Sequence, residues 1–225
     1  MDNITNCILS KTNRLNIQPE ITPGGEHYSM FNDAGTEVEV SEFLYGFARL
    51  VKPERILETG THIGVSTAYF ASALEANDKG LISTFEVIPQ HYHNASLLLQ
   101  DLGVHNRVDF NLRSSLDFTP PVNTQYDILF LDSEPQLRFA EFNRFWPHLR
   151  SGGYVIIHDL NDQLGHHGQI YHDEFDWPWG DFRKSIGGYI KDNLVNVISF
   201  DNPRGMTIFQ KTREQAAYYK MAKND

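Results

Sequence analysis

The sequence predicts an α/β protein with a doubly wound, mostly parallel sheet of seven strands that ends in an antiparallel hairpin. From about residue 37 to residue 210, short apolar runs alternate with segments in which apolar residues recur at helical spacing, as in repeated strand-helix units. Several of the apolar runs end in an acidic residue. The last two runs, 194–200 and 206–210, are joined by a short turn and are predicted to form the hairpin.

The chain of 225 residues is long enough for one α/β domain with elaborations. Residues 1–36 are polar and are interrupted by proline and glycine, so we expect an irregular leader or cap with room for one short helix. This leader is a candidate cover for the ligand site. Residues 37–225 are expected to form the main domain.

The composition narrows the choice of partner and compartment. The 19 basic and 29 acidic residues give a net charge of -10, which argues against nucleic acid and anionic membrane surfaces and favours a small-molecule partner. A single cysteine, Cys7, excludes an intrachain disulfide framework and agrees with a reducing compartment such as the cytoplasm. Neither a signal peptide nor an apolar run long enough for a membrane span is found. A homo-oligomer stays open.

The individual elements follow from the alternation. The near-continuous apolar run at 126–132 is typical of a central parallel strand covered on both faces. Helices are predicted at 37–51, 67–74, 89–102, 136–147 and 181–193, with further strands around 56–57 and at 80–86, 108–112 and 154–159. The segment 160–180 is long, polar and aromatic, so we expect it to form part of the substrate pocket or a lid.

A glycine-rich turn follows the first strand of the main domain. It begins with Glu58, places Gly60 and Gly64 where the backbone must turn sharply or approach a ligand, and leads to Ser66 at the start of a helix. The turn has two glycines, whereas the dinucleotide-binding fingerprint has three, so a nicotinamide cofactor is disfavoured. The alternative is that these glycines serve only a tight turn.

Two further positions at strand ends suit a nucleoside. Glu86 ends the second strand, roughly 20 residues beyond the glycine turn, where a carboxylate can accept both ribose hydroxyls. The alternative for Glu86 is a solvated residue at a strand end. Ser114 and Ser115 follow the third strand and could contact an adenine edge, although serines in such loops are usually turn formers.

These features together resemble class I S-adenosylmethionine-dependent methyltransferases with a Rossmann-like fold. From about residue 37 to residue 210 the chain is similar to catechol O-methyltransferase-like enzymes and to sugar O-methyltransferases of macrolide and aminocoumarin biosynthesis. The segments that carry the resemblance are 56–66, 85–86, 130–132 and 152–159. They are specific for the cofactor and only suggestive for the acceptor.

The resemblance implies roles for the cofactor-binding residues. Those expected around the methionine part of S-adenosylmethionine are Glu58, Gly60, Gly64 and Ser66. It further implies that Glu86 holds the ribose, that Ser114 and Ser115 lie by the adenine, and that Asp132 faces the sulfonium and the acceptor.

The resemblance also implies a divalent cation, most simply magnesium, held by Asp132 and Asp159. The sequence departs from the family here, because His158 and Leu160 flank Asp159 in place of a second acid or an asparagine. The residues considered as substitutes are Asn161, Asp162 and Glu134. The spacing of the histidines in the 160–180 loop, His166, His167 and His172, fits no zinc site and favours a solvated loop.

The catalytic base is the least defined part of the predicted site. The lysine of catechol-type enzymes is missing, since Ser133, Glu134 and Pro135 follow Asp132. Asp132, Glu134 and His158 are the candidates for taking the acceptor's proton. His158 has two interpretations, a base or ligand at a strand end, or a core histidine bonded to the backbone.

The sequence therefore predicts a metal-assisted O-methyltransferase for a small hydroxylated acceptor, such as a sugar or a natural-product intermediate. The nearest alternative is a metal-independent N- or carboxyl-methyltransferase that binds the same cofactor. A non-catalytic binding subunit with the same fold is a second alternative, and an aminopropyltransferase ranks below both.

Overall fold

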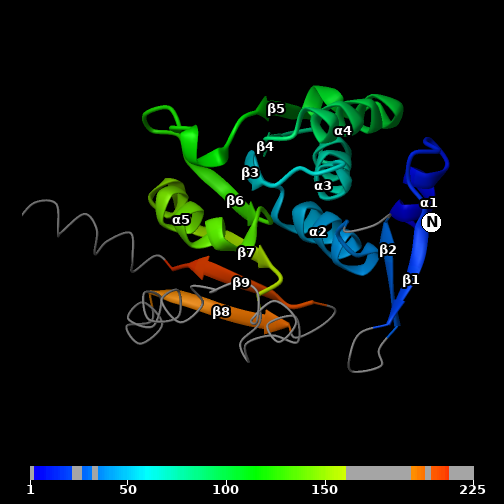
Figure 1. The fold of residues 1–225 in the computed structure, drawn as a ribbon. Helices are drawn as coiled ribbons and strands as arrows, with labels where there is room; N and C mark the ends of the chain where they lie inside the picture. The colour runs from blue at the N-terminus through cyan, green and yellow to red at the C-terminus, as the bar shows by residue number, and fades with distance from the viewer. Residues whose placement is uncertain (1–2, 22–26, 32–34, 161–193, 201–203, 213–225) are drawn as a thin grey trace, which may run out of the picture. The chain divides into compact units, whose positions relative to one another are not determined.

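The fold is taken from a computed structural model, which describes residues 3–21, 27–31, 35–160, 194–200 and 204–212 (Figure 1). The loop and helix predicted within 161–193, most of the hairpin turn and the tail beyond residue 212 lie outside the described residues. The chain divides into two compact units, residues 1–118 and 119–225. Seven strands follow the sheet order β5-β4-β3-β6-β7-β9-β8, which confirms the predicted doubly wound class.

The first unit supplies three parallel strands and the helices between them. Its main elements are α2 (Val38–Val51), β3 (Arg55–Thr59), α3 (Val65–Ala76), β4 (Leu81–Glu86), α4 (Pro89–Leu102) and β5 (Val108–Leu112). β4 pairs in parallel with β3 on one side and with β5 on the other. All three strands therefore end at the same edge, where Glu86 is in register with Leu112.

The helices of this unit bury the faces that the periodicity predicts. α2 buries Val40, Leu44 and Ala48, which recur at i, i+4 and i+8. α4 buries the predicted apolar residues Ala95, Leu98, Leu99 and Leu102. α3 is buried on nearly all sides, including the aromatic rings of Tyr69 and Phe70, so it is the central helix of this unit.

The leader is more ordered than the sequence indicates. It contains α1 (Ile4–Leu9) and an antiparallel pair of strands, β1 (Ile17–Ile21) and β2 (His27–Phe31). Three of its apolar residues, Ile8, Leu15 and Phe31, are buried in the core that also contains residues of α3 and α4. The hairpin was not predicted because Pro19 and the glycines nearby suggest irregular chain, whereas long-range packing stabilises the two short strands.

The second unit contains the remaining strands of the sheet and one helix. Its elements are β6 (Tyr126–Leu131), α5 (Pro135–Phe145), β7 (Leu149–His158), β8 (Val195–Phe200) and β9 (Met206–Lys211). β6 and β7 are parallel, whereas β9 is antiparallel to both β7 and β8, which confirms the predicted C-terminal hairpin. β7 begins five residues earlier than predicted, because the strand continues through Gly152 and Gly153, where the sequence suggested a turn.

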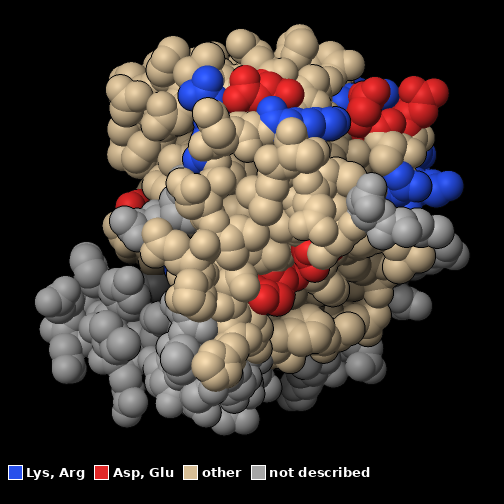
Figure 2. Space-filling model, turned by 90° about the vertical axis from the view of Figure 1, so that its right-hand side faces the viewer, with Lys and Arg blue, Asp and Glu red and all other residues tan. Residues whose placement is uncertain are grey.

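Basic and acidic side chains lie next to one another on the upper part of the face in Figure 2, most of which is neither basic nor acidic. Ion pairs of this kind join Arg107 to Glu75 and Asp78, and Arg14 to Asp101. Among the helices that the structure describes, none is both long enough and apolar enough to cross a membrane.

Position 64 requires glycine for two reasons, its backbone conformation and the close packing of α4. Its φ is +88°, in the left-handed region, and a Cβ atom there would lie 2.8 Å from the Cβ atom of Ala95 on α4. Gly64→Ala should therefore lower the free energy of unfolding by roughly 2–4 kcal/mol, as measured by urea denaturation. Gly46→Ala is the matched control, because Gly46 lies within α2 with nothing within 4 Å of its added Cβ. This control should be more stable than the wild type by about 0.5–1 kcal/mol.

Lys211 is a buried cation at the end of β9. Its ammonium group donates to the carbonyl oxygens of Trp146 (3.0 Å) and Leu149 (2.9 Å) and lies 5.2 Å from the centre of the Trp146 ring. It thereby ties β9 to the segment that leads into β7. Burial lowers the pKa of Lys211 to about 8, because the low-dielectric surroundings disfavour the charged form.

This lowered pKa predicts the pH dependence of stability. Below pH 8 the lysine is charged in both states, so the cost of burying the charge is fully present. Between pH 8 and about 10.4 only the unfolded chain holds the proton, so stability rises with pH. Denaturation at pH 7.5 and 10 should show this rise in the wild type relative to Lys211→Met. The exposed Lys79→Met variant should behave as the wild type, and parallel curves for wild type and Lys211→Met would contradict the assignment.

Candidate functional site

The glycine-rich turn leaves β3 and is attached to the end of β4. Gly60 and Gly64 have φ of +82° and +88°, and His62 adopts +50° although it is not glycine. The amides of Gly60 and Thr61 both donate to the carbonyl oxygen of Phe85, at 3.2 and 3.1 Å. Left-handed residues at such a density are typical of turns that bring the backbone close to a ligand.

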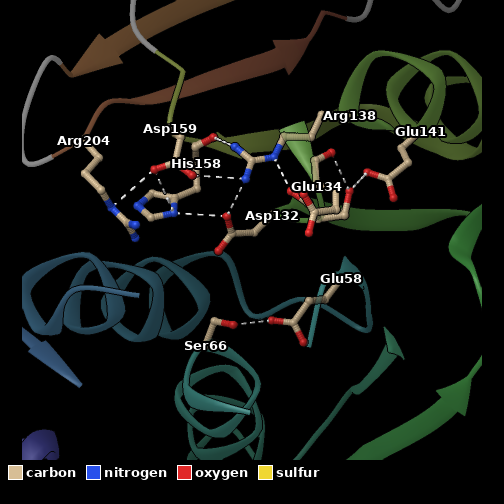
Figure 3. A network of polar contacts seen from close by, with 10 residues as sticks. Glu58, Ser66, Asp132, Glu134, Arg138, Glu141, His158, Asp159 and Arg204 are labelled. Carbon is tan, nitrogen blue, oxygen red and sulfur yellow. Dashed lines mark hydrogen bonds and ion pairs between the residues drawn. The ribbon is translucent and has the colours of Figure 1, made fainter. Parts of the chain in front are cut away.

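Glu58 lies fully buried beneath this turn. Its carboxylate accepts hydrogen bonds from the hydroxyls of Ser66 (2.6 Å; Figure 3) and Thr84 (2.6 Å), and a third from Thr67. Thr61 continues the network through a 2.6 Å contact with Thr84. A buried carboxylate needs such donors, so the cluster joins β3, β4 and the first turn of α3.

The structure thus brings together Glu58 and Ser66, which were both predicted to surround the methionine part of a cofactor. Their hydrogen bond to each other also has a structural function, because it fixes both side chains beneath the turn. Their contact with a cofactor stays a prediction.

Glu86 ends β4 and is almost fully buried. Its Oε2 accepts a hydrogen bond from the amide of His62 (2.7 Å), while Oε1 accepts from the amides of Val87 (2.9 Å) and Ile88 (2.8 Å). A carboxylate oxygen can accept about two hydrogen bonds. In the described part of the chain Oε2 has a single donor, so this oxygen retains acceptor capacity for a ligand hydroxyl.

Two histidines border Glu86. His91 Nδ1 lies 3.8 Å from Glu86 Oε1, and the rings of His62 and His91 meet edge to face with centres 4.5 Å apart. The predicted carboxylate is therefore held rigidly between the glycine turn and the start of α4.

Ser114 and Ser115 follow β5 as predicted. Ser114 caps a short 3-10 turn, Ser115–Asp117, by accepting a hydrogen bond from the amide of Leu116 (3.2 Å), and Ser115 is buried. The turn-forming interpretation thus describes Ser114 well, while the adenine contact of both serines stays a prediction. The sequence reasoning missed the neighbouring Arg113, whose guanidinium lies 5.0 Å from the centre of the Phe118 ring.

The leader lies beside the glycine turn. Asn13, Arg14 and Leu15 line a cavity of about 360 Å³. The other residues at this cavity are Ile63, from the glycine turn, and Asn94 and Leu98, from α4. The expectation that the leader covers a ligand site stays a prediction, but its residues do border the predicted turn.

The second unit contains a cluster of charged residues at the ends of β6 and β7. Asp132 follows β6, and His158 and Asp159 end β7. His158 is fully buried, and its Nδ1 lies 3.1 Å from Asp132 Oδ1 and 3.8 Å from Asp159 Oδ1. One nitrogen or oxygen atom from each of the three residues lies within 4.8 Å of the others. This places His158 in the cluster, as its interpretation as a ligand or base requires.

Arg138 of α5 lies against both acids of this cluster (Figure 3). Its Nη2 is 3.1 Å from Asp132 Oδ1 and 3.1 Å from Asp159 Oδ2. Its Nε donates to the carbonyl oxygen of Ser133 (2.8 Å), and its Nη1 donates to that of His158. The arginine is 3% exposed, so its charge is buried among these acceptors.

A second arginine completes the charge balance at Asp159. Arg204 Nε lies 3.3 Å from Asp159 Oδ1. Burial opposes ionisation of Asp159, but the positive charges of His158, Arg204 and Arg138 outweigh it and hold the pKa of this carboxyl well below its usual range. Asp159 also adopts a left-handed φ of +54°, which turns the chain at the end of β7.

Sequence reasoning missed both arginines. It predicted a helix at 136–147 but gave no role to Arg138 and Glu141, which are buried on this helix together with Phe142 and Phe145. Two charged residues at i and i+3 among core aromatics are an unusual pattern and were the available signal. Of the predicted substitutes for a third metal ligand, Glu134 is not part of the described group of ligand atoms, and Asn161 and Asp162 lie outside the described residues, as do His166, His167 and His172.

The sheet order is the one predicted for a class I methyltransferase fold. Residues 57–160 match the model of a family described as methyltransferase domain. The match begins next to Glu58 and ends next to Asp159, so it includes the residues predicted to bind the cofactor and the predicted acid pair.

Named relatives agree with this class. The chain is 28% identical over 120 residues to catechol O-methyltransferase of Mycobacterium tuberculosis, covering 53% of this chain and 54% of that protein. It is also 28% identical over 122 residues to catechol O-methyltransferase of Niastella koreensis, covering 52% and 54%. The chain thus aligns with about half the length of these relatives.

Solved structures share the fold. The O-methyltransferase TomG from Streptomyces achromogenes, in complex with S-adenosylmethionine, superposes with a TM-score of 0.66 at 23% identity, covering 80% of this chain and 83% of that chain. An O-methyltransferase from Bacillus cereus, in complex with S-adenosylhomocysteine, superposes with a TM-score of 0.63 at 18% identity, covering 80% and 84%.

Thr84 tests the hydroxyl network beneath the turn. Thr84→Val removes one donor to the buried Glu58, so the free energy of unfolding should fall by roughly 1–3 kcal/mol, as measured by urea denaturation. The neighbouring Ser83 bonds to Asp109 near the surface, and Ser83→Ala should change stability by less than about 0.5 kcal/mol. Equal effects of the two substitutions would show that Glu58 does not depend on its hydroxyl donors.

Proposed function

We propose that this protein transfers a methyl group from S-adenosylmethionine to a hydroxyl group of a small acceptor. The observation that carries the proposal is the family match over residues 57–160, which includes the glycine turn, Glu86 and the charged cluster. The names of the relatives support oxygen as the methylated atom.

The first unit is assigned to the cofactor. When bound, S-adenosylmethionine supplies an electrophilic methyl group on a positively charged sulfur. Glu86 is proposed to accept a ribose hydroxyl through Oε2, which has one described donor. The turn from Glu58 to Gly64 is proposed to hold the methionine part, with the hydroxyl network fixing its shape.

The second unit is assigned to the acceptor. Methyl transfer needs the acceptor oxygen in line with the methyl group, and such positioning accelerates reactions by up to roughly 7–11 kcal/mol of barrier. The acceptor hydroxyl must also lose its proton. Asp132 and His158 lie together in the charged cluster, so they are the preferred candidates for receiving it, ahead of Glu134. His158 can do so only in its uncharged form.

Metal assistance, which the sequence predicts, was tested against the residues present. Asp132, His158 and Asp159 place ligand atoms close together, but Arg138 contacts both carboxylates and Arg204 contacts one of them. A divalent cation prefers oxygen ligands whose charge is not already neutralised. The described residues as they lie do not fit such an ion, and metal assistance stays a prediction from sequence alone.

The alternatives from sequence differ in what they bind. An N- or carboxyl-methyltransferase would bind S-adenosylmethionine and use a different acceptor atom. A non-catalytic subunit or an aminopropyltransferase would not bind it productively. Calorimetric titration of the purified protein with S-adenosylmethionine therefore comes first, followed by a screen of hydroxylated, amine and carboxylate acceptors. A folded protein that does not bind the cofactor would contradict the proposal.

Glu86 gives the sharpest test of cofactor binding. Glu86→Ala should weaken binding of S-adenosylmethionine by roughly 1.5–3 kcal/mol, because charge-assisted hydrogen bonds to the ribose are lost. Calorimetric titration measures this change, and Glu75→Ala, at an exposed carboxylate of α3, should bind as the wild type does.

A cofactor analogue without the ribose 2′-hydroxyl separates direct contact from an effect on the turn. The wild type should bind this analogue more weakly than S-adenosylmethionine, whereas Glu86→Ala should not discriminate between the two. Equal discrimination by both proteins would remove Glu86 from the ribose site.

A further inference from the structure

Two carboxylates at the ends of neighbouring parallel strands require a nearby positive charge. The side chains of Asp132 and Asp159 are only 14% and 19% exposed, and both belong to a group whose ligand atoms lie within 4.8 Å of one another. When two carboxyl groups lie this close and this far from water, ionisation of both is unfavourable unless a cation lies against them. In a metal site that cation is the ion itself.

We propose that the guanidinium group of Arg138 takes the place of a divalent cation between Asp132 and Asp159, so that this acid pair functions without a metal ion. A single nitrogen, Nη2, contacts one oxygen of each carboxylate at 3.1 Å, as a bridging ion would do. Figure 3 shows Arg138 directed toward both acids, with Arg204 at Asp159.

The hydrogen bonds of Arg138 hold it in this position. A guanidinium has five N–H groups, and four of them have described acceptors, namely the two carboxylates and the carbonyl oxygens of Ser133 and His158. These acceptors belong to the ends of β6 and β7. An entering ion would have to displace a buried arginine that cannot lose its charge and leave two carbonyl oxygens without their donor.

Positive groups already lie beside both acids without an ion. Asp132 and Asp159 are contacted by the guanidinium group of Arg138, Asp159 also by that of Arg204, and His158 lies beside both acids. A divalent cation added to this cluster would be repelled by both guanidinium groups in a region of low dielectric. Removing Arg138 would instead leave the two carboxylates and His158 with ligand atoms within 4.8 Å of one another and one repelling charge fewer.

The decisive experiment measures Mn²⁺ binding by electron paramagnetic resonance, without cofactor or acceptor. The wild type should not bind Mn²⁺ at the acid pair. Arg138→Met should bind it at least about tenfold more tightly, because the repelling charge is gone while an unbranched side chain remains. Adding Asp132→Asn to this variant should abolish the gained site.

Two further variants serve as control and safeguard. Arg150→Met removes an arginine from the ion pair with Asp127 in the same unit, and it should bind no more Mn²⁺ than the wild type. Arg204→Met removes the second guanidinium, which is 19% exposed, so it should fold even where Arg138→Met does not. It should show a smaller gain in the same direction, with circular dichroism confirming the fold of each variant.

Two results would overturn the inference. One is a wild type that binds Mn²⁺ stoichiometrically and loses it in Asp132→Asn. The other is a set of folded arginine variants that gain no binding. The inference rests on the proposed function only for its consequence in turnover, where a chelator should leave the wild-type rate unchanged. Absence of S-adenosylmethionine binding would instead contradict the proposed function and leave the Mn²⁺ result standing.

Discussion

The structure depends on the groups that stabilise buried carboxylates at the ends of its parallel strands. Glu58 is compensated by hydroxyl groups, Glu86 by backbone amides, and the pair Asp132 and Asp159 by guanidinium groups. Each set of contacts attaches the end of a strand to the element that follows it or to one that lies beside it. Because an uncompensated buried carboxylate is costly, the local geometry of the strand ends follows from these contacts.

The three sets of contacts have different chemical consequences. In the first unit the carboxylates accept hydrogen bonds from hydroxyls and amides, and a ligand hydroxyl is a donor of the same kind. In the second unit, guanidinium groups already offset the negative charge of the two acids, which suits an uncharged acceptor better than a cation.

Much of the fold was predictable because it depends on local pattern. The helix 89–102 and the strands 108–112 and 194–200 were predicted with bounds that agree with the structure to within a residue, since apolar spacing, Pro89 and Gly103 mark them. The leader hairpin was missed because its strands are stabilised by packing of residues such as Phe31 rather than by their own sequence.

The sequence by itself determined the sheet class, the glycine turn and the positions of the acids at strand ends, because periodicity and turn chemistry are local properties. Only the tertiary structure decided what each acid contacts. Arg138 is 6 residues from Asp132 but 21 from Asp159, and Arg204 is 45 residues beyond Asp159. Such contacts arise when strands and a helix pack together. No rule about sequence spacing could therefore show that guanidinium groups form ion pairs with both acids.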